Sequence, residues 1–307
     1  MLSQLSADEA AGRTFHRLLD LVPSDDRPFV LPLHPDARQP LSFKGLHAFA
    51  RSLEGTLSGI DSARVAIALP NGPTLAVCIL ALSSHGVACA PLNPDLSDDE
   101  SRFELDDLPA GALVLPLDRA VGSSARLAAV GLGIHLIELE SSVQTCGLFA
   151  LHCAAPGVLD TRPHPCAPHS LGRETTALLM HTSGTTRRPK LVPLSHRQLG
   201  VGSLCVASTL ALVRKDVTLN VMPLYHLHGL MINVFVSAVA GAVVVCAPRF
   251  LPSRVLEWLT VGDVAMRAVA TWYSAVPTVV RRHCGTQPIT VDHTKGLEPV
   301  TSRRPVM

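Results

Sequence analysis

The chain carries little charge of either sign. Asp, Glu, Lys and Arg together make up 17% of its 307 residues, and 26 basic side chains face 25 acidic ones, which gives a formal net charge of +1. Proteins that bind nucleic acid or an anionic membrane surface electrostatically present a clear basic excess, so this composition supports neither partner. Apolar residues make up 47%, which excludes a disordered chain and is enough to form a sizeable core.

A regular cysteine pattern is also missing. The eight cysteines have no regular spacing and do not predict a disulfide framework. The first 15 residues include acidic side chains and no long apolar stretch, so they do not predict a secretory signal. We therefore expect a reducing, cytoplasmic setting.

Zinc-binding residue types occur together in one segment, but without the spacing that zinc sites use. Residues 150–176 contain Cys153, His164, Cys166 and His169. Structural zinc sites present closely spaced cysteine or histidine pairs, whereas the gaps here are irregular and prolines intervene. We therefore expect a proline-stiffened loop with incidental histidine and cysteine, and no metal site.

One segment is apolar enough to raise the question of a membrane span. Residues 230–247 contain no charged side chain and are just long enough to cross a bilayer. However, Asn233 and Ser237 lie one turn apart, and at Gly241 the composition changes to a valine run typical of a buried parallel strand. The segment therefore predicts a buried helix over 230–240 and a core strand over 242–246, with no membrane span.

Short apolar runs recur along the first half of the chain. Residues 64–69, 87–93 and 111–117 are typical of buried strands, and residues 74–86 between the first two are typical of a helix. An alternation of strands and helices favours an α/β fold with largely parallel sheets. Residues 150–176 interrupt this alternation with four prolines. We expect that segment to be a surface connection between two lobes.

Local signals mark where two of these helices end or begin. Gly86 lies just past the end of the first, as is typical of a helix C-terminus. Ser97 and Glu100 have the spacing of a capping box, so a second helix is expected to begin there. The acidic residues that follow are most simply explained as a solvated helix face.

The stretch "HTSGTTRRPK", residues 181–190, directly follows an apolar run. Backbone amides, hydroxyl groups, a glycine and a lysine are the groups that bind a polyphosphate. The stretch is not a Walker A loop, because it lacks the Gly-Lys-Ser/Thr ending. Two interpretations stay open on composition alone, a phosphate site and a polar turn. We expect a strand that ends near Met180 and a mobile loop over 182–190, with Lys190 facing solvent or phosphate.

Four segments, in order, resemble one known family. They are "VAIALPNGPTLAVCILALSSHGVACAPLNP" (65–94), "LLMHTSGTTRRPKLVPLSHRQL" (178–199), "VMPLYHLHGLMINVF" (221–235) and "TWYSAVPTVV" (271–280). Together they are similar to the adenylate-forming enzymes, the acyl-CoA synthetase and luciferase superfamily, and most like its oxalate–CoA ligase branch. The resemblance implies an ATP-dependent ligase that converts a carboxylic acid into acyl-AMP and then transfers the acyl group to coenzyme A, with Mg²⁺ accompanying ATP.

The resemblance also implies roles for particular residues. The β- and γ-phosphates of ATP would be held by Thr182, Ser183, Gly184, Thr185, Thr186 and Lys190. His226 is the candidate catalytic residue beside the adenylate and the carboxylate. The acyl pocket would be lined by His226, His228, Gly229 and Trp272. For the histidines and the tryptophan, core packing remains an alternative.

Two departures from the family pattern affect these implications. Arg187 stands where the family has a small residue, and arginine either stiffens the loop or adds a phosphate contact. After residue 287 the sequence contains no Tyr-Gly-x-Thr-Glu segment of the kind that closes on adenine, and no match to the hinge or the adenylation lysine. We therefore expect a partial AMP-binding domain over 1–287, with lobes at about 1–150 and 176–287, and an unrelated tail over 288–307.

These departures leave two functions open for the chain itself. It is a carboxylate–CoA ligase by resemblance, and the alternative is an inactive truncated fragment with a binding or regulatory role, or a gene-model artefact. We expect the 307-residue chain to bind ATP weakly and not to catalyse carboxylate-dependent ATP–pyrophosphate exchange, because positioning of the reactants supplies much of the rate.

Overall fold

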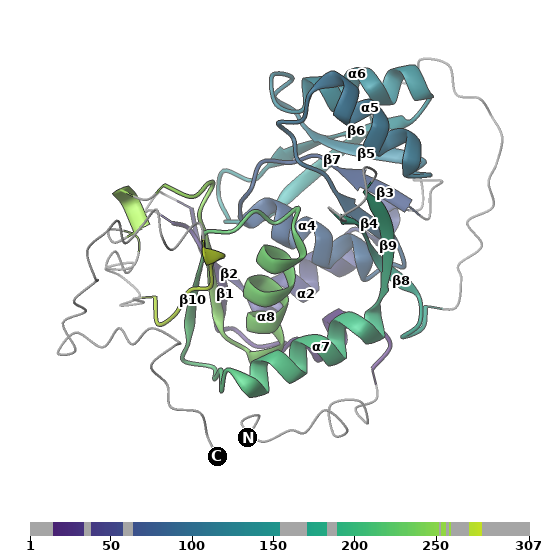
Figure 1. Cartoon of the computed structure of the whole chain (residues 1–307). Helices are drawn as coiled ribbons and strands as arrows, with labels where there is room; N and C mark the ends of the chain where they lie inside the picture. The colour runs from purple at the N-terminus through teal and green to yellow at the C-terminus, as the bar shows by residue number, and fades with distance from the viewer. Residues whose placement is uncertain are drawn as a thin grey trace.

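The computed structural model describes the chain in several stretches. They are residues 15–33, 38–57, 64–153, 171–182, 189–251, 253–255, 258 and 270–277. The strands within these stretches form two sheets, one of seven strands in the order β7-β6-β5-β3-β4-β8-β9 and one of four in the order β10-β11-β1-β2 (Figure 1). The α/β fold expected from the sequence is therefore confirmed.

The seven-stranded sheet has a parallel centre and antiparallel edges. Its strands are β3 (Arg64–Ile67), β4 (Ala88–Pro91), β5 (Ala112–Pro116), β6 (His135–Ser141), β7 (Phe149–Cys153), β8 (Thr176–Thr182) and β9 (Lys190–Ser195). The pairs from β6 through β5, β3 and β4 to β8 are parallel, while β7 and β9 pair antiparallel with β6 and β8. All three strands predicted between residues 64 and 117 belong to its centre.

The four-stranded sheet draws on both ends of the described chain. Its strands are β1 (Pro28–Leu31), β2 (Leu41–Ser42), β10 (Val217–Asn220) and β11 (Val243–Cys246). β1 pairs parallel with β11 across more than 200 positions of sequence, through Val30 opposite Val244. Conversely, β8 and β9 lie after the predicted connection at 150–176 but belong to the seven-stranded sheet, with β3 to β7. Each sheet therefore contains strands from both sides of the predicted connection at 150–176.

The helices divide into an outer pair and a central layer. The described helices are η1 (Leu18–Leu21), α2 (Phe43–Ser52), α3 (Glu54–Leu57), α4 (Pro73–Ser83), α5 (Asp98–Asp107), α6 (Ser123–Leu132), α7 (His196–Thr209), η2 (His228–Phe235) and α8 (Val236–Ala240). α5 and α6 cover the outer face of the seven-stranded sheet, whereas α2, α4, α7 and α8 lie between the two sheets (Figure 1).

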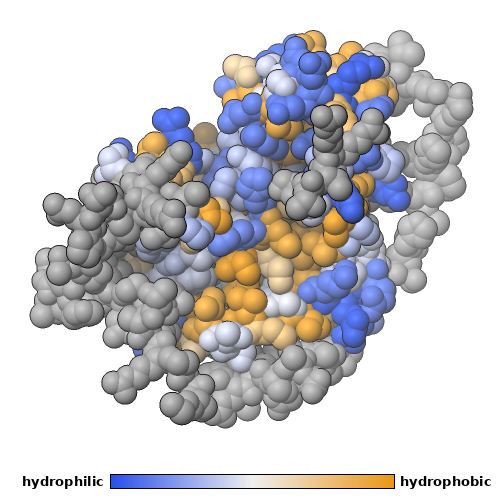
Figure 2. All heavy atoms as spheres, viewed as in Figure 1, coloured by the Kyte–Doolittle hydropathy of each residue, from blue (hydrophilic) through white to orange (hydrophobic). Residues whose placement is uncertain are grey.

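The central layer is held by apolar burial. Nine of the eleven residues of α4 are buried, and all of these except Ser83 belong to a single core cluster that includes side chains from both sheets. Partly buried apolar residues on the adjoining helices, among them Val206 and Met231, pack against this cluster. Figure 2 shows apolar atoms gathered over α8 and toward α7 in the middle of the visible face. A helix such as α4, which is apolar on almost every side, has to be covered on all sides, and the two sheets and the neighbouring helices provide this cover.

The two predicted helix boundaries are confirmed. Ser97 Oγ accepts a hydrogen bond from the Glu100 amide at 3.4 Å, and the Glu100 carboxylate accepts one from the Ser97 amide at 3.0 Å. Gly86 follows the end of α4 with a φ of +82°, a backbone conformation that side chains disfavour.

The uncharged segment 230–247 also forms a buried helix and a strand, as predicted. The helical part begins as a π-helix, η2, and continues as α8 up to Gly241, whose φ of +70° ends it. β11 then pairs with β10 and β1. Among the described residues, no helix has the length and apolarity that crossing a bilayer requires.

Three expectations are corrected or fall outside the described residues. Residues 150–153 are not part of a connection, because they belong to β7, where Leu151 pairs with Leu139. β8 continues past Met180 to Thr182, which pairs with Lys190 at the start of β9, so these two residues end strands and only the residues between them connect the hairpin. His164, Cys166 and His169 lie outside the described residues.

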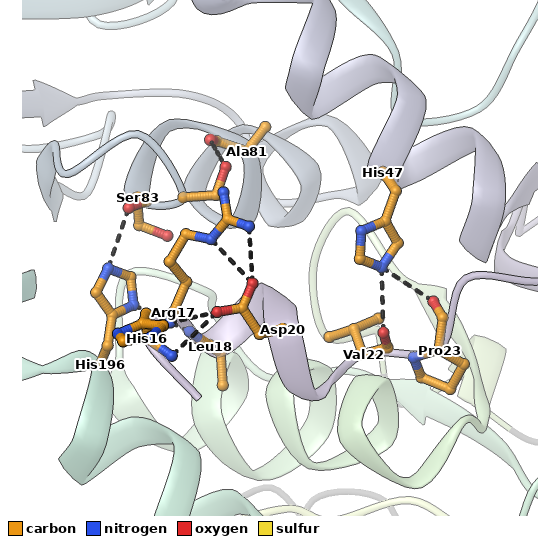
Figure 3. Close-up of polar contacts among 11 residues, drawn as sticks. His16, Arg17, Leu18, Asp20, Val22, Pro23, His47, Ala81, Ser83 and His196 are labelled. Carbon is orange, nitrogen blue, oxygen red and sulfur yellow. Dashed lines mark hydrogen bonds and ion pairs between the residues drawn. The ribbon is translucent and has the colours of Figure 1, made fainter. Parts of the chain in front are cut away.

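The N-terminal segment is fastened to the central layer by a buried histidine (Figure 3). His196 is fully buried, and its Nδ1 accepts a hydrogen bond from the Leu18 amide at 3.1 Å. Its Nε2 lies 3.1 Å from the Ser83 carbonyl oxygen. A carbonyl can only accept, so Nε2 carries the proton and the ring is neutral. Burial lowers the pKa of His196 to about 4, only partly opposed by the Ser83 hydrogen bond and by Asp20.

We predict that His196 makes the fold sensitive to acid. In the unfolded chain a histidine binds a proton near pH 6.5, whereas the folded ring resists protonation down to about pH 4. The free energy of unfolding is therefore intact above pH 6.5 and decreases as the pH falls toward 4, by about 3 kcal/mol at most. Urea unfolding at pH 7.5 and pH 4.5 measures the difference.

The control variants separate His196 from the other histidines. His196→Gln removes the titrating ring, so it should lose less stability than the unsubstituted chain over this pH range. His152→Gln, at an exposed position on β7, should behave like the unsubstituted chain. Equal acid losses in all three proteins would contradict the role of His196.

Candidate functional site

The loops of the two sheets meet at the carboxyl ends of their parallel strands. β3 is followed by Asn71, β10 by residues 221–227, and β11 by Ala247. Asn71 Nδ2 donates to the Ala247 carbonyl oxygen at 2.7 Å, and Asn71 Oδ1 accepts from the Leu224 amide at 2.8 Å. One amide side chain of the seven-stranded sheet therefore holds two loops of the four-stranded sheet. In α/β folds this edge is where ligands bind.

A tight turn carries the predicted His226 and Gly229. The His226 amide donates to the Pro223 carbonyl at 3.3 Å, and the Leu230 amide donates to the His226 carbonyl at 3.1 Å. A Cβ on Gly229 would overlap the Pro223 carbonyl oxygen and lie 2.9 Å from that of Met222. Glycine is therefore needed here for backbone packing. It allows the chain to enter η2 directly after the turn.

The His226 ring is exposed at the tip of this turn. It makes an edge-on contact with Tyr225, with ring centroids 4.9 Å apart. Partial desolvation by its surroundings lowers the pKa of His226, and desolvation together with Asp95 raises the pKa of Tyr225. Both side chains are therefore neutral at pH 7, and both can donate or accept hydrogen bonds.

His228 and Trp272 occupy different environments. His228 Nε2 lies 2.9 Å from Ser274 Oγ, which joins the turn to the segment 270–277. That segment runs beside β10, where the Leu219 amide donates to the Trp272 carbonyl at 3.1 Å. The Trp272 side chain is 4% exposed and belongs to the main core cluster.

The two described residues of the predicted phosphate site, Thr182 and Lys190, lie on the seven-stranded sheet. Thr182 and Lys190 are paired where the β8–β9 hairpin meets its connection, both are exposed, and Thr182 Oγ1 donates to the Lys190 carbonyl at 3.3 Å. No ion pair to the Lys190 ammonium occurs within the described stretches. Ser183, Gly184, Thr185, Thr186 and Arg187 lie outside the described residues.

Acidic residues border this hairpin on one side. His181, the residue before Thr182, has its Nε2 3.2 Å from Asp107 Oδ2 on α5. Burial raises the pKa of nearby Glu104, although His181 opposes the shift. The contact fixes the end of β8 against α5.

Sequence reasoning missed the asparagines that organise this region. Asn71 lies in a Pro-Asn-Gly-Pro turn, where it looks like ordinary loop punctuation. Asn220 and Asn233 are fully buried. The one available signal was Asn233, together with Ser237, inside an uncharged apolar run. Both are hydrogen-bonded: Ser237 Oγ lies 2.6 Å from Thr218 Oγ1, and Asn233 Nδ2 donates to Asn220 Oδ1 at 2.7 Å.

Comparison with known proteins assigns the fold and the motifs to one family. The family model described as AMP-binding enzyme matches residues 25–300. The chain therefore belongs to the AMP-binding enzyme family, as the four sequence segments predicted.

Several relatives are CoA ligases. The chain is 32% identical over 235 residues to the oxalate–CoA ligase of Saccharomyces cerevisiae, covering 70% of this chain and 41% of that protein. It is 30% identical over 259 residues to the sulfoacetate–CoA ligase of Cupriavidus necator, covering 83% of this chain and 47% of that protein. The chain thus spans less than half the length of these relatives.

Solved structures show the same fold. ATP-bound MatB from Rhodopseudomonas palustris superposes with a TM-score of 0.67 at 22% identity, over 89% of this chain and 52% of that one. The o-succinylbenzoate–CoA synthetase of Bacillus subtilis, in complex with its acyl-adenylate, gives a TM-score of 0.62 at 24% identity over 83% of this chain and 47% of that one.

We predict that Gly229→Ala destabilises the protein by about 1–3 kcal/mol, because the added methyl group has no space beside two carbonyl oxygens. Gly131→Ala is the matched control. Its Cβ would meet only the flexible end of Arg102 at 3.4 Å, and alanine is the better helix former by about 1 kcal/mol. Urea denaturation compares the two variants. A Gly229→Ala protein as stable as the control would show that the close approach is not needed.

Proposed function

We propose that the chain provides the phosphate-binding and acyl-binding parts of an ATP-dependent carboxylate–CoA ligase. Such an enzyme joins a carboxylic acid to AMP with release of pyrophosphate and then transfers the acyl group to coenzyme A. Support comes from the family match over residues 25–300. The observation that carries the proposal to this site is Asn71, which holds together loops from both sheets at their carboxyl edge.

The β8–β9 hairpin is suited to the triphosphate end of Mg·ATP. The pairing of Thr182 with Lys190 brings the two ends of the hydroxyl-rich connection together. Lys190 is exposed and thus available to an anionic ligand. Hydroxyl and ammonium donors fixed at a strand end stabilise the charge that develops on departing pyrophosphate. In this proposal Thr182, Ser183, Gly184, Thr185, Thr186 and Lys190 hold the β- and γ-phosphates.

The turn at 223–229 is suited to the acyl side. His226 is exposed and neutral at pH 7, so it can donate a hydrogen bond to a carboxylate without forming an ion pair that would have to be broken. His228 and Gly229 lie on the same turn. In this proposal Trp272 lines the acyl pocket from the core side. It lies in the segment 270–277, which His228 contacts at Ser274. We propose a small organic acid as the substrate, because oxalate–CoA and sulfoacetate–CoA ligases are among the relatives.

The test is Mg·ATP binding by the 307-residue chain, measured by calorimetry. Lys190→Ala removes a charge-assisted contact, so we predict affinity about ten- to a hundredfold weaker. Lys44→Ala is the matched control, because Lys44 is exposed and pairs with Asp26 at 3.2 Å at the start of α2. Its affinity should stay within about twofold of the unsubstituted chain. Equal ATP affinity in the Lys190→Ala and Lys44→Ala proteins would contradict the proposed phosphate site.

A further inference from the structure

A chain of hydrogen bonds runs from the backbone of Met222 to the ring of His228. It passes through the side chains of Asn220, Asn233 and Ser274. The two asparagines are fully buried, on β10 and η2 respectively. Each buried amide has to satisfy its polar atoms inside the protein, so the direction of every hydrogen bond in the chain is constrained.

The direction is set at the Met222 peptide group. Its N–H can only donate and its carbonyl can only accept. The Asn220 atom 3.1 Å from the Met222 nitrogen is therefore the amide oxygen, and the atom 3.0 Å from the Met222 carbonyl oxygen is the amide nitrogen. The buried Cys246 thiol also lies against the Asn220 side chain, and burial raises its pKa to about 12, so it is neutral.

The next two members follow from this orientation. Asn220 Oδ1 is an acceptor, so the Asn233 atom 2.7 Å away is the amide nitrogen, which donates. The other Asn233 atom is then the amide oxygen, which accepts the Ser274 hydroxyl at 2.5 Å. A serine hydroxyl has one proton, and here it is committed to Asn233. Ser274 Oγ must therefore accept at its contact with His228, so Nε2 carries a proton.

We propose that Asn220, Asn233 and Ser274 are positioning residues that hold His228 as the neutral, Nε2-protonated tautomer, with Nδ1 as a hydrogen-bond acceptor. The hydrogen bonds place a proton on Nε2, and the use of this ring in acyl binding rests on the proposed function. No member of the chain carries a charge, so none compensates a protonated ring. Partial burial in the same region lowers the pKa of His228, which agrees with a neutral imidazole.

The same contacts explain why two distant segments stay together. Ser274 lies in the segment 270–277 and His228 begins η2, and their contact is backed by a second tie, in which Thr271 Oγ1 donates to Asp216 Oδ1 at 2.9 Å. The Thr271 contact can hold the segment in place when Ser274 is changed. A Ser274 variant therefore tests the tautomer without releasing the whole segment.

The experiment is ¹⁵N nuclear magnetic resonance of the histidine rings in the full chain at pH 7.5, with His228→Gln used to assign the His228 signals. We expect the unsubstituted chain to show His228 protonated at Nε2. Ser274→Ala removes the acceptor, so the ratio of the two tautomers should shift toward Nδ1–H by about five- to tenfold. Ser274→Thr retains a hydroxyl and should restore the original ratio.

Ser237→Ala is the matched control. It removes a buried hydroxyl that is hydrogen-bonded to Thr218 on β10, and Ser237 is not a member of the hydrogen-bond series from Met222 to His228. A His228 ring protonated mainly at Nδ1 in the unsubstituted protein would overturn the proposal, and so would equal shifts in the Ser274→Ala and Ser237→Ala proteins. Loss of the proposed ligase function would appear separately, as ATP affinity insensitive to Lys190→Ala, and would leave the tautomer result unchanged.

Discussion

The arrangement of the site depends on the side-chain amide of Asn71. It lies in the loop after β3 of the seven-stranded sheet, and it satisfies one backbone donor and one backbone acceptor of the four-stranded sheet, at Leu224 and Ala247. These are the loops that follow β10 and β11. Elsewhere a layer of helices packs between the two sheets, and backbone hydrogen bonds of Gln39 join the segment before β2 to the connection between β6 and β7. A direct polar contact at the edge fixes the loops themselves.

The sequence predicted the parts of the fold that local patterns determine. The capping box at Ser97 and Glu100 located the start of α5, and the valine run after Gly241 distinguished β11 from the helix before it. The four-stranded sheet was not predictable in the same way. β1 and β11 pair across most of the chain, and no periodicity in either strand indicates its partner. β8 also ends two residues later than expected, because pairing with β9 extends it beyond the apolar run.

Prediction of the site divided along similar lines. Composition predicted a phosphate site at the hydroxyl-rich stretch and Lys190, and family resemblance predicted His226, His228 and Gly229, which lie on one turn, for the acyl side. These roles stay predictions. Neither indicated Asn220 or Ser274, because a serine or asparagine has no special local pattern when its partners come from other elements. Trp272 shows the reverse limit. Its backbone is hydrogen-bonded to β10, while its ring is buried in the main core cluster. A sequence match does not distinguish a ring that packs in the core from one that lines a pocket.

The central claim is that Asn71 joins the loops of the two sheets into one ligand site. Calorimetric titration of Mg·ATP into the Asn71→Ala and Gln144→Ala proteins tests it most directly, because Gln144 is an exposed amide in the turn between β6 and β7. We predict that Asn71→Ala weakens ATP binding about tenfold, because the loops after β10 and β11 are no longer held against the sheet that carries the phosphate residues, while Gln144→Ala leaves it unchanged. Unchanged ATP affinity in a folded Asn71→Ala protein would contradict the account.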